Sequence, residues 1–143
     1  MIRAVIDTSV LMRGFMSQRG PAGRVLVAVS RRTFEPVVSE SSLVELRRVV
    51  SRPSRDRHRI DQSVAELVMS CLEEQPLVTI EATPALVTIR DAKDAYLVRT
   101  AIAGGAAFLV SVDNDLLVLA DDLRPFGVEV VTPARFVEIL GAD

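Results

Sequence analysis

Apolar residues occur along the chain in two different spacings. Short runs that are apolar almost throughout cover residues 2–6, 35–38, 107–112 and 128–131, and a plausible fifth covers 77–80. Unbroken apolar runs of this length predict strands that are buried on both faces. Elsewhere apolar residues recur every three or four positions, most clearly over residues 61–74, and this is the spacing of a helix with one buried face.

The two kinds of segment alternate along the chain. Helical patterns cover residues 21–28, 41–50, 61–74, 94–103, 114–120 and 133–140. Strands that alternate with helices predict an α/β fold of three layers, α/β/α, around a central, mainly parallel sheet of four to five strands. A chain of 143 residues fits one domain, which we expect to span residues 1–143.

Composition narrows the class of protein further. Hydrophobic residues make up 49% of the chain and charged residues 25%, as in globular proteins. No apolar run approaches the length of a membrane span, and the first residues have the pattern of a strand rather than of a signal peptide. A lone cysteine, Cys71, cannot form an intramolecular disulfide and suits a reducing cytoplasm; its place on an apolar stripe predicts a core residue.

The net charge of −2 does not indicate a nucleic-acid-binding protein, and the distribution of arginine is more informative than the net charge. Six arginines lie close together: Arg47, Arg48, Arg52, Arg55, Arg57 and Arg59. A guanidinium group can bind two phosphate oxygens at once, so this segment could contact a phosphate backbone. The alternative is a solvated helix end and loop. We expect residues 52–59 to form a loop that becomes ordered on binding, with His58 a solvated residue or a phosphate contact.

Carboxylates follow the predicted strands. Asp7 comes directly after the first strand, and Asp113 comes directly after the strand 107–112, with Asp115 two residues later. Asp94 stands at the start of a helix, and Glu45 lies in the helix after the second strand. The carboxyl ends of parallel strands share one edge of a sheet, where ligands bind. Oxygen ligands without histidine or cysteine favour Mg²⁺ or Mn²⁺ over zinc.

Helix capping is the alternative for single members of this set. Asp7 and Asp113 each precede a helix and could be its N-cap. Asp91 could cap the helix that contains Asp94, and Asp121 and Asp122 are most simply surface residues. Four carboxylates directed to the same edge are less simply explained by capping alone.

At these residues the sequence resembles the PIN-domain family of metal-dependent ribonucleases, most closely its branch of toxins from bacterial toxin–antitoxin pairs. The motifs that carry the resemblance are "VIDTSVL", "SSLVELRRVV", "DAKDAYLVRTAI" and "FLVSVDNDLL". Each motif is short, and their order and spacing make the match specific over nearly the whole chain.

The resemblance implies a set of site residues. The acidic quartet of the family falls on Asp7, Glu45, Asp94 and Asp113, with Asp115 as a further acid, and supporting hydroxyls fall on Thr8, Ser9 and Ser111. Relatives often carry two adjacent acids where this chain has Asp94 and Ala95, which could weaken a second metal site.

The resemblance also implies an activity and partners. The activity would be hydrolysis of phosphodiester bonds in single-stranded RNA, with one or two Mg²⁺ or Mn²⁺ ions, and the arginine segment would bind the RNA. The protein would be a homodimer that is silenced by an antitoxin.

Two other classes compete with this interpretation. One is a phosphotransfer or phosphatase domain, but Ser9 stands where such phosphatases need a second aspartate, and Lys93 is the only lysine. The other is a catalytically weak PIN-fold module that binds RNA or protein.

Overall fold

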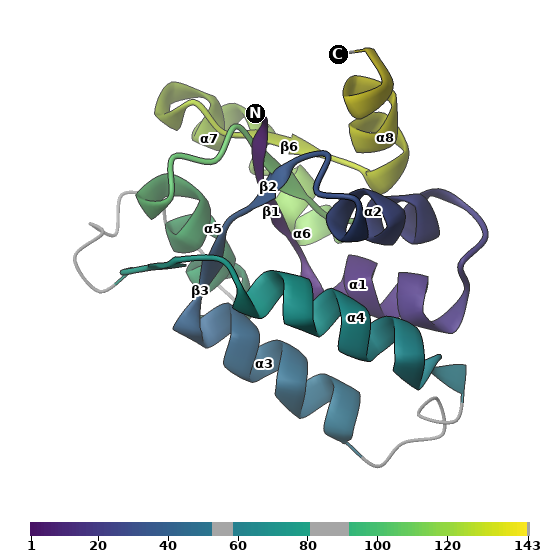
Figure 1. Ribbon diagram of the computed structural model, residues 1–143. Helices are drawn as coiled ribbons and strands as arrows, with labels where there is room; N and C mark the ends of the chain where they lie inside the picture. Colours follow the sequence, from purple (N-terminus) through teal and green to yellow (C-terminus); the bar gives the residue numbers. More distant parts are fainter. Residues whose placement is uncertain (53–58, 81–91, 143) are drawn as a thin grey trace.

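The computed structural model describes residues 1–52, 59–80 and 92–142, and its helices surround a central parallel sheet (Figure 1). The strands are β1 (Arg3–Ile6), β2 (Glu35–Pro36), β3 (Val38–Ser39), β4 (Leu77–Val78), β5 (Phe108–Val110) and β6 (Glu129–Val131). The helices are α1 (Thr8–Met16), α2 (Pro21–Ser30), α3 (Glu40–Ser51), α4 (Gln62–Glu73), α5 (Ala92–Ala103), α6 (Asn114–Leu117), α7 (Ala120–Leu123) and α8 (Pro133–Ala142), with a 3-10 turn at Arg124–Phe126.

The main sheet has four parallel strands in the order β2-β1-β5-β6, and β3 and β4 form a separate parallel pair. The predicted α/β class with a parallel sheet between helices is therefore confirmed. The order places β1 beside β5, with Ile6 opposite Val110. The residues that follow these two strands therefore lie at the same edge of the sheet.

Alternate residues of the strands are buried on opposite faces, which explains why the strand sequences are apolar throughout. Ala4 and Val110 belong to a core formed with α1, α2, α4 and α8, whereas Val5 and Leu109 belong to a core formed with α5, α6 and α7. Cys71 is buried in the first of these cores, as its place on the apolar stripe predicted. The two cores give the layers on either side of the sheet.

Two predicted elements differ in detail from the structure. The predicted strand 35–38 is divided into β2 and β3. The predicted helix 114–120 contains α6, which ends at Leu117, and stops at Ala120, where the separate helix α7 begins. The predicted end of α5 at the glycine pair is correct: Gly105 has a φ of +62°, and Ala106 N donates to Ala101 O. Such a left-handed residue closes a helix and is favourable for glycine.

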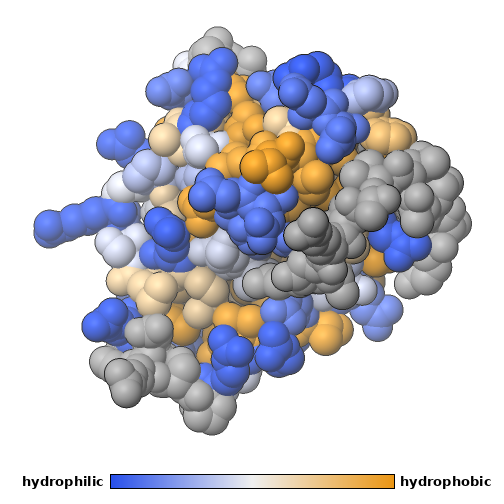
Figure 2. Space-filling model, turned by 180° about the vertical axis from the view of Figure 1, so that it is seen from behind, coloured by the Kyte–Doolittle hydropathy of each residue, from blue (hydrophilic) through white to orange (hydrophobic). Residues whose placement is uncertain are grey.

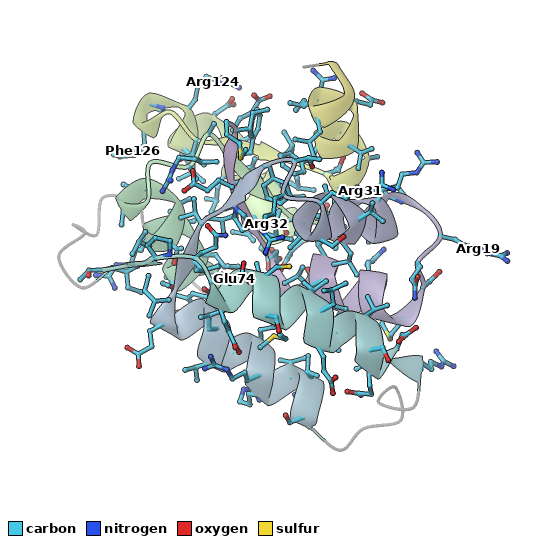
Figure 3. The ribbon with its side chains drawn as sticks, viewed as in Figure 1. Arg19, Arg31, Arg32, Glu74, Arg124 and Phe126 are labelled. Carbon is cyan, nitrogen blue, oxygen red and sulfur yellow. The ribbon has the colours of Figure 1, made fainter. Side chains whose placement is uncertain are left out.

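The face of the molecule opposite to the view of Figure 1 carries many hydrophilic side chains. Seen from behind, hydrophilic side chains project over most of the molecule, and apolar side chains form patches between them (Figure 2). Ion pairs join neighbouring elements, such as Arg32 after α2 with Glu74 after α4, at 2.6 Å (Figure 3). In the described part of the chain, no helix combines the length and hydropathy needed to cross a membrane.

Candidate metal centre

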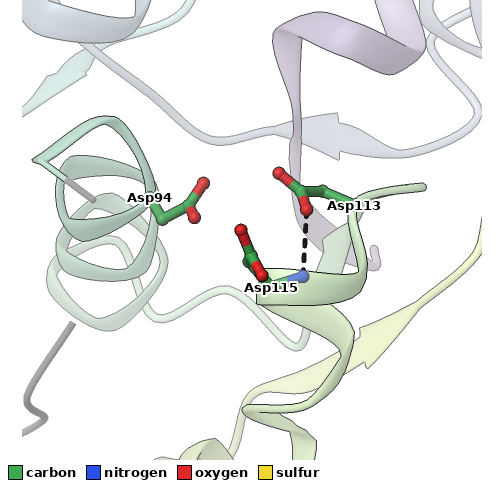
Figure 4. Close-up of side chains that lie close together, drawn as sticks. All are labelled: Asp94, Asp113 and Asp115. Carbon is green, nitrogen blue, oxygen red and sulfur yellow. Dashed lines mark hydrogen bonds between the residues drawn. The ribbon is translucent and has the colours of Figure 1, made fainter. Parts of the chain in front are cut away.

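Three aspartates converge at the carboxyl edge of the sheet. Asp94 lies in the first turn of α5, Asp113 is the N-cap of α6, and Asp115 is in the first turn of α6. One carboxylate oxygen from each lies within 4.8 Å of the others (Figure 4). Asp94 is buried, Asp113 is half-buried and Asp115 is exposed, so the group has one side open to solvent. We refer to these three residues as the aspartate triad.

Local hydrogen bonds orient the α6 part of the triad. The backbone N–H of Asp115 donates to Asp113 Oδ1 at 2.9 Å, which is the capping bond of α6 (Figure 4). Capping uses one oxygen of Asp113, so the second oxygen can still bind a ligand. The alternatives of cap and ligand are therefore compatible at this residue.

Asp7 lies beside the triad but is not one of its three members. It is 2% exposed, and it caps α1 by accepting from Ser9 N at 3.3 Å. Ser111, which is fully buried, donates to Asp7 Oδ2 at 2.8 Å and accepts from Asp113 N at 3.0 Å. Because Ile6 and Val110 are paired, Asp7 and Ser111 are level with each other at the ends of their strands. Ser111 thus connects Asp7 to the triad.

Glu45 also lies outside the triad. Its side chain on α3 is only 18% exposed, and Arg48, one turn later, binds both of its carboxylate oxygens at 2.8 and 3.0 Å. The bond and charge of Glu45 raise the pKa of the Arg48 guanidinium. Arg48 therefore neutralises the carboxylate that the sequence assigned to the metal site.

Tyr96 of α5, which the sequence analysis did not identify, is close enough to both outer acids for their charges to act on its pKa. Burial raises its pKa to about 12; the Thr8 side chain lowers the pKa, and the charges of Glu45 and Asp7 raise it. The hydroxyl oxygen is enclosed without a hydrogen-bond partner among the described residues, and the Thr8 side chain is close enough to lower its pKa. The charges of Glu45 and Asp7 therefore both act on this side chain of α5.

The predicted supporting hydroxyls occupy different environments. Thr8 is buried at the start of α1, and Ser111 forms the bridge described above. The hydroxyl of Ser9 is enclosed without a hydrogen-bond partner among the described residues. Of the three, Ser111 is the one with bonds that reach a member of the triad.

The donor set of the triad fits a hard divalent cation. Three carboxylates held this close repel one another unless a cation or protons compensate them. Oxygen ligands with one open side match Mg²⁺ or Mn²⁺, which retain water molecules when bound. In a metal site, several acidic, histidine or cysteine side chains bring their ligand atoms close together. Among the described residues 1–52, 59–80 and 92–142, the aspartate triad is the group of three or more such side chains whose ligand atoms are close enough together to hold a metal.

The structure describes four of the six arginines: Arg47, Arg48, Arg52 and Arg59. Arg47 pairs with Glu73 at 3.2 Å and Arg48 pairs with Glu45. Arg52 and Arg59 are exposed. Arg55, Arg57 and the neighbouring His58 lie outside the described residues, as does Asp91, so their predicted roles stay predictions. Asp121 and Asp122 are exposed in α7, in agreement with the surface prediction.

Comparison with protein families gives a match to the PIN domain over residues 3–115. The matched range includes the aspartate triad, Asp7 and Glu45. The chain belongs to the PIN-domain family, whose members are generally metal-dependent nucleases. No curated protein and no solved structure matches the chain in the other two comparisons.

Proposed function

We propose that the protein is a divalent-metal-dependent endoribonuclease that cleaves phosphodiester bonds of single-stranded RNA. The observation that carries the proposal is the aspartate triad, at the carboxyl edge of a parallel sheet, in a chain of the PIN-domain family. Mg²⁺ or Mn²⁺ held there would supply the Lewis acidity that phosphodiester hydrolysis requires.

The residues around the triad have separate tasks in this proposal. Asp94, Asp113 and Asp115 hold the cation and orient it towards the open side of the site. Ser111 and Asp7 keep Asp113 in place, because Ser111 contacts the backbone of one acid and the carboxylate of the other. Glu45 joins the site as a further ligand when Arg48 moves from its carboxylate to a phosphate of the RNA.

The proposal is tested by cleavage of an unstructured RNA in the presence of Mn²⁺. We expect wild-type protein to cut the RNA internally and EDTA to stop the reaction. The variants Asp94→Asn and Asp113→Asn should lower the cleavage rate at least about 100-fold, since the loss of even an outer partner of a metal ligand costs about 10- to 100-fold. Asp122→Asn removes an exposed acid of α7 and is the matched control, with an unchanged rate.

Two results would overturn the nuclease proposal. If all three variants cut RNA as fast as wild type, the cleavage does not come from the triad. If wild-type protein binds RNA but does not cut it with Mn²⁺ or Mg²⁺, the chain is a binding module of the PIN fold.

The finer proposal is that this nuclease is the toxin of a toxin–antitoxin pair, a homodimer silenced by a small antitoxin in the cytoplasm. The support is the resemblance in sequence, in particular the motifs around Asp7 and Asp113. The test is to express the chain alone and together with the product of the neighbouring reading frame. Growth arrest that depends on Asp113 and is relieved by the neighbour supports a toxin; unimpaired growth with active nuclease indicates another cellular role.

A further inference from the structure

A groove of about 510 Å³ lies at the carboxyl edge of the sheet, at a different place from the triad. The C-terminal end of α1, the beginnings of α2 and α8, and the segments after β5 and β6 surround it. Its lining is mainly apolar and includes Met16, Pro21, Val112 and Pro133. Ligand sites of proteins typically have volumes of about 300 to 1,000 Å³, so the groove can hold a group as large as a nucleotide.

The charge of the groove favours an anionic ligand. Arg13 and Arg19 line it, both are exposed, and no acidic residue is part of the lining. Neither arginine has an ion pair or side-chain hydrogen bond with any residue that the structure describes. Arg19 extends from the connection between α1 and α2, away from the body of the molecule (Figure 3). The two guanidinium groups are therefore available for phosphate oxygens.

The groove and the candidate metal centre are neighbours along the chain. Val112 lines the groove, and the next residue, Asp113, is a member of the triad. Ser111, on the other side of Val112, bonds to Asp7. Because Val112 and Asp113 are consecutive, a single strand of RNA that passes over the end of β5 can reach both the groove and the triad.

We propose that this groove binds one unpaired nucleotide of the RNA, next to the phosphate that is cleaved. The base lies on the apolar lining, and Arg13 and Arg19 bind the adjoining phosphates. Apolar contact is available to every base, so the site accepts single strands and excludes paired bases, whose faces are stacked in a duplex. The proposal rests on the proposed nuclease function, and it adds a subsite that sets the preference for single strands.

The first test measures binding without cleavage. A fluorescein-labelled ten-nucleotide oligouridylate is titrated with protein in EDTA, and its fluorescence anisotropy is followed at several salt concentrations. We expect the double variant Arg13→Ala, Arg19→Ala to bind about tenfold more weakly. The slope of log affinity against log salt should fall in magnitude by about 1.4, which is about 0.7 for each phosphate contact that is lost.

Arg31→Ala is the matched control for this test. Arg31 is exposed and caps the C-terminal end of α2, about 15 Å along the helix from the groove. We expect affinity and salt slope of Arg31→Ala to equal those of wild type. If each arginine removed costs the same RNA affinity in the double variant as in Arg31→Ala, the proposal is overturned. Absence of RNA binding by wild type would also overturn it.

A second pair of variants changes the lining itself. Ala134 is exposed in the groove at the beginning of α8, where an acidic residue is compatible with the helix. Ala134→Glu should weaken RNA binding severalfold more than the neutral, equally long Ala134→Gln. Wild type should also bind the oligouridylate severalfold more tightly than an abasic strand of the same length. Equal affinities in either comparison would overturn the proposal.

These measurements separate the groove from the nuclease. Binding in EDTA that depends on Arg13 and Arg19, without any cleavage when Mn²⁺ is added, supports the groove and overturns the nuclease. Cleavage that depends on Asp113, together with binding that is independent of the groove variants, supports the nuclease and overturns the groove.

Discussion

Ser111 is the residue that joins two of the predicted acids. It is fully buried, and its hydroxyl bonds to Asp7 and to the backbone of Asp113. We expect Ser111→Ala to lower the free energy of unfolding by about 2 kcal/mol, since a buried carboxylate loses a hydrogen bond. Urea unfolding measures this value, with the exposed helical Ser70→Ala as the control. Equal stability of the two variants would contradict the bridging role of Ser111.

Tyr96 offers a spectroscopic probe of the same region, because it is the only tyrosine and the chain has no tryptophan. Its pKa is raised from 10.0 to about 12, mainly by burial. The neutral phenol is thus favoured in the folded state, and this contribution to stability is complete below pH 10 and is lost as the pH rises towards 12.

The absorbance of tyrosinate near 295 nm, followed against pH, tests this environment. We expect a midpoint of about 12 for folded protein and of about 10 in concentrated urea, where the side chain is solvated. A midpoint near 10 in the folded protein would show that the phenol is solvated rather than buried.

Individual residues of the site could be predicted from sequence to different degrees. Asp94, Asp113 and Asp115 were predictable because each stands at the end of an apolar run or the start of a helix. Tyr96 was not, because two residues along a helix from Asp94 is not a spacing that places side chains on one face. Arg48 and Glu45 are three residues apart, a common spacing for ion pairs within a helix. Their contact was not predicted, because the sequence analysis assigned Glu45 to the metal site and Arg48 to the RNA.

At the scale of elements, α6 depends on Asp113 for its cap as well as for its place in the triad. Asparagine and aspartate are equally good N-caps, and alanine is a poor one. We therefore expect Asp113→Asn to keep the unfolding free energy of wild type while losing metal binding, and Asp113→Ala to lose about 1 kcal/mol in addition. Urea unfolding of both variants measures the difference. If Asp113→Asn is as unstable as Asp113→Ala, the cap is not what the residue contributes to stability.

The boundaries of elements were less predictable where a segment pairs first with one strand and then with another. The apolar run 35–38 contains β2, which pairs with β1, and the start of β3, which pairs with β4. The two are separate strands because Val37 N donates to Ala4 O and the chain then leaves the main sheet. Hydrophobic spacing reports burial and not which strand is the neighbour, so the division was not visible. The same is true of α6 and α7, whose apolar residues Leu116 and Leu123 enter one core from two short helices.

At the scale of the whole molecule, the site depends on contacts between distant parts of the chain. The pairing of β1 with β5 places Asp7 beside Ser111, and the packing of α5 on the same face places Asp94 near α6. The alternation of strands and helices predicted a parallel sheet and its common edge, but not the strand order β2-β1-β5-β6. That order is set by long-range pairing, so the close approach of three acids required the structure.

The central claim is that the aspartate triad binds a divalent cation, and Mn²⁺ binding tests it most directly. The electron paramagnetic resonance signal of free Mn²⁺ falls when the ion binds, so a titration gives affinity and stoichiometry. We predict saturable binding by wild type that Mg²⁺ displaces, loss of this binding in Asp94→Asn and Asp113→Asn, and wild-type binding in Asp122→Asn. An undiminished free-ion signal with wild type, or equal binding by all three variants, would contradict the account.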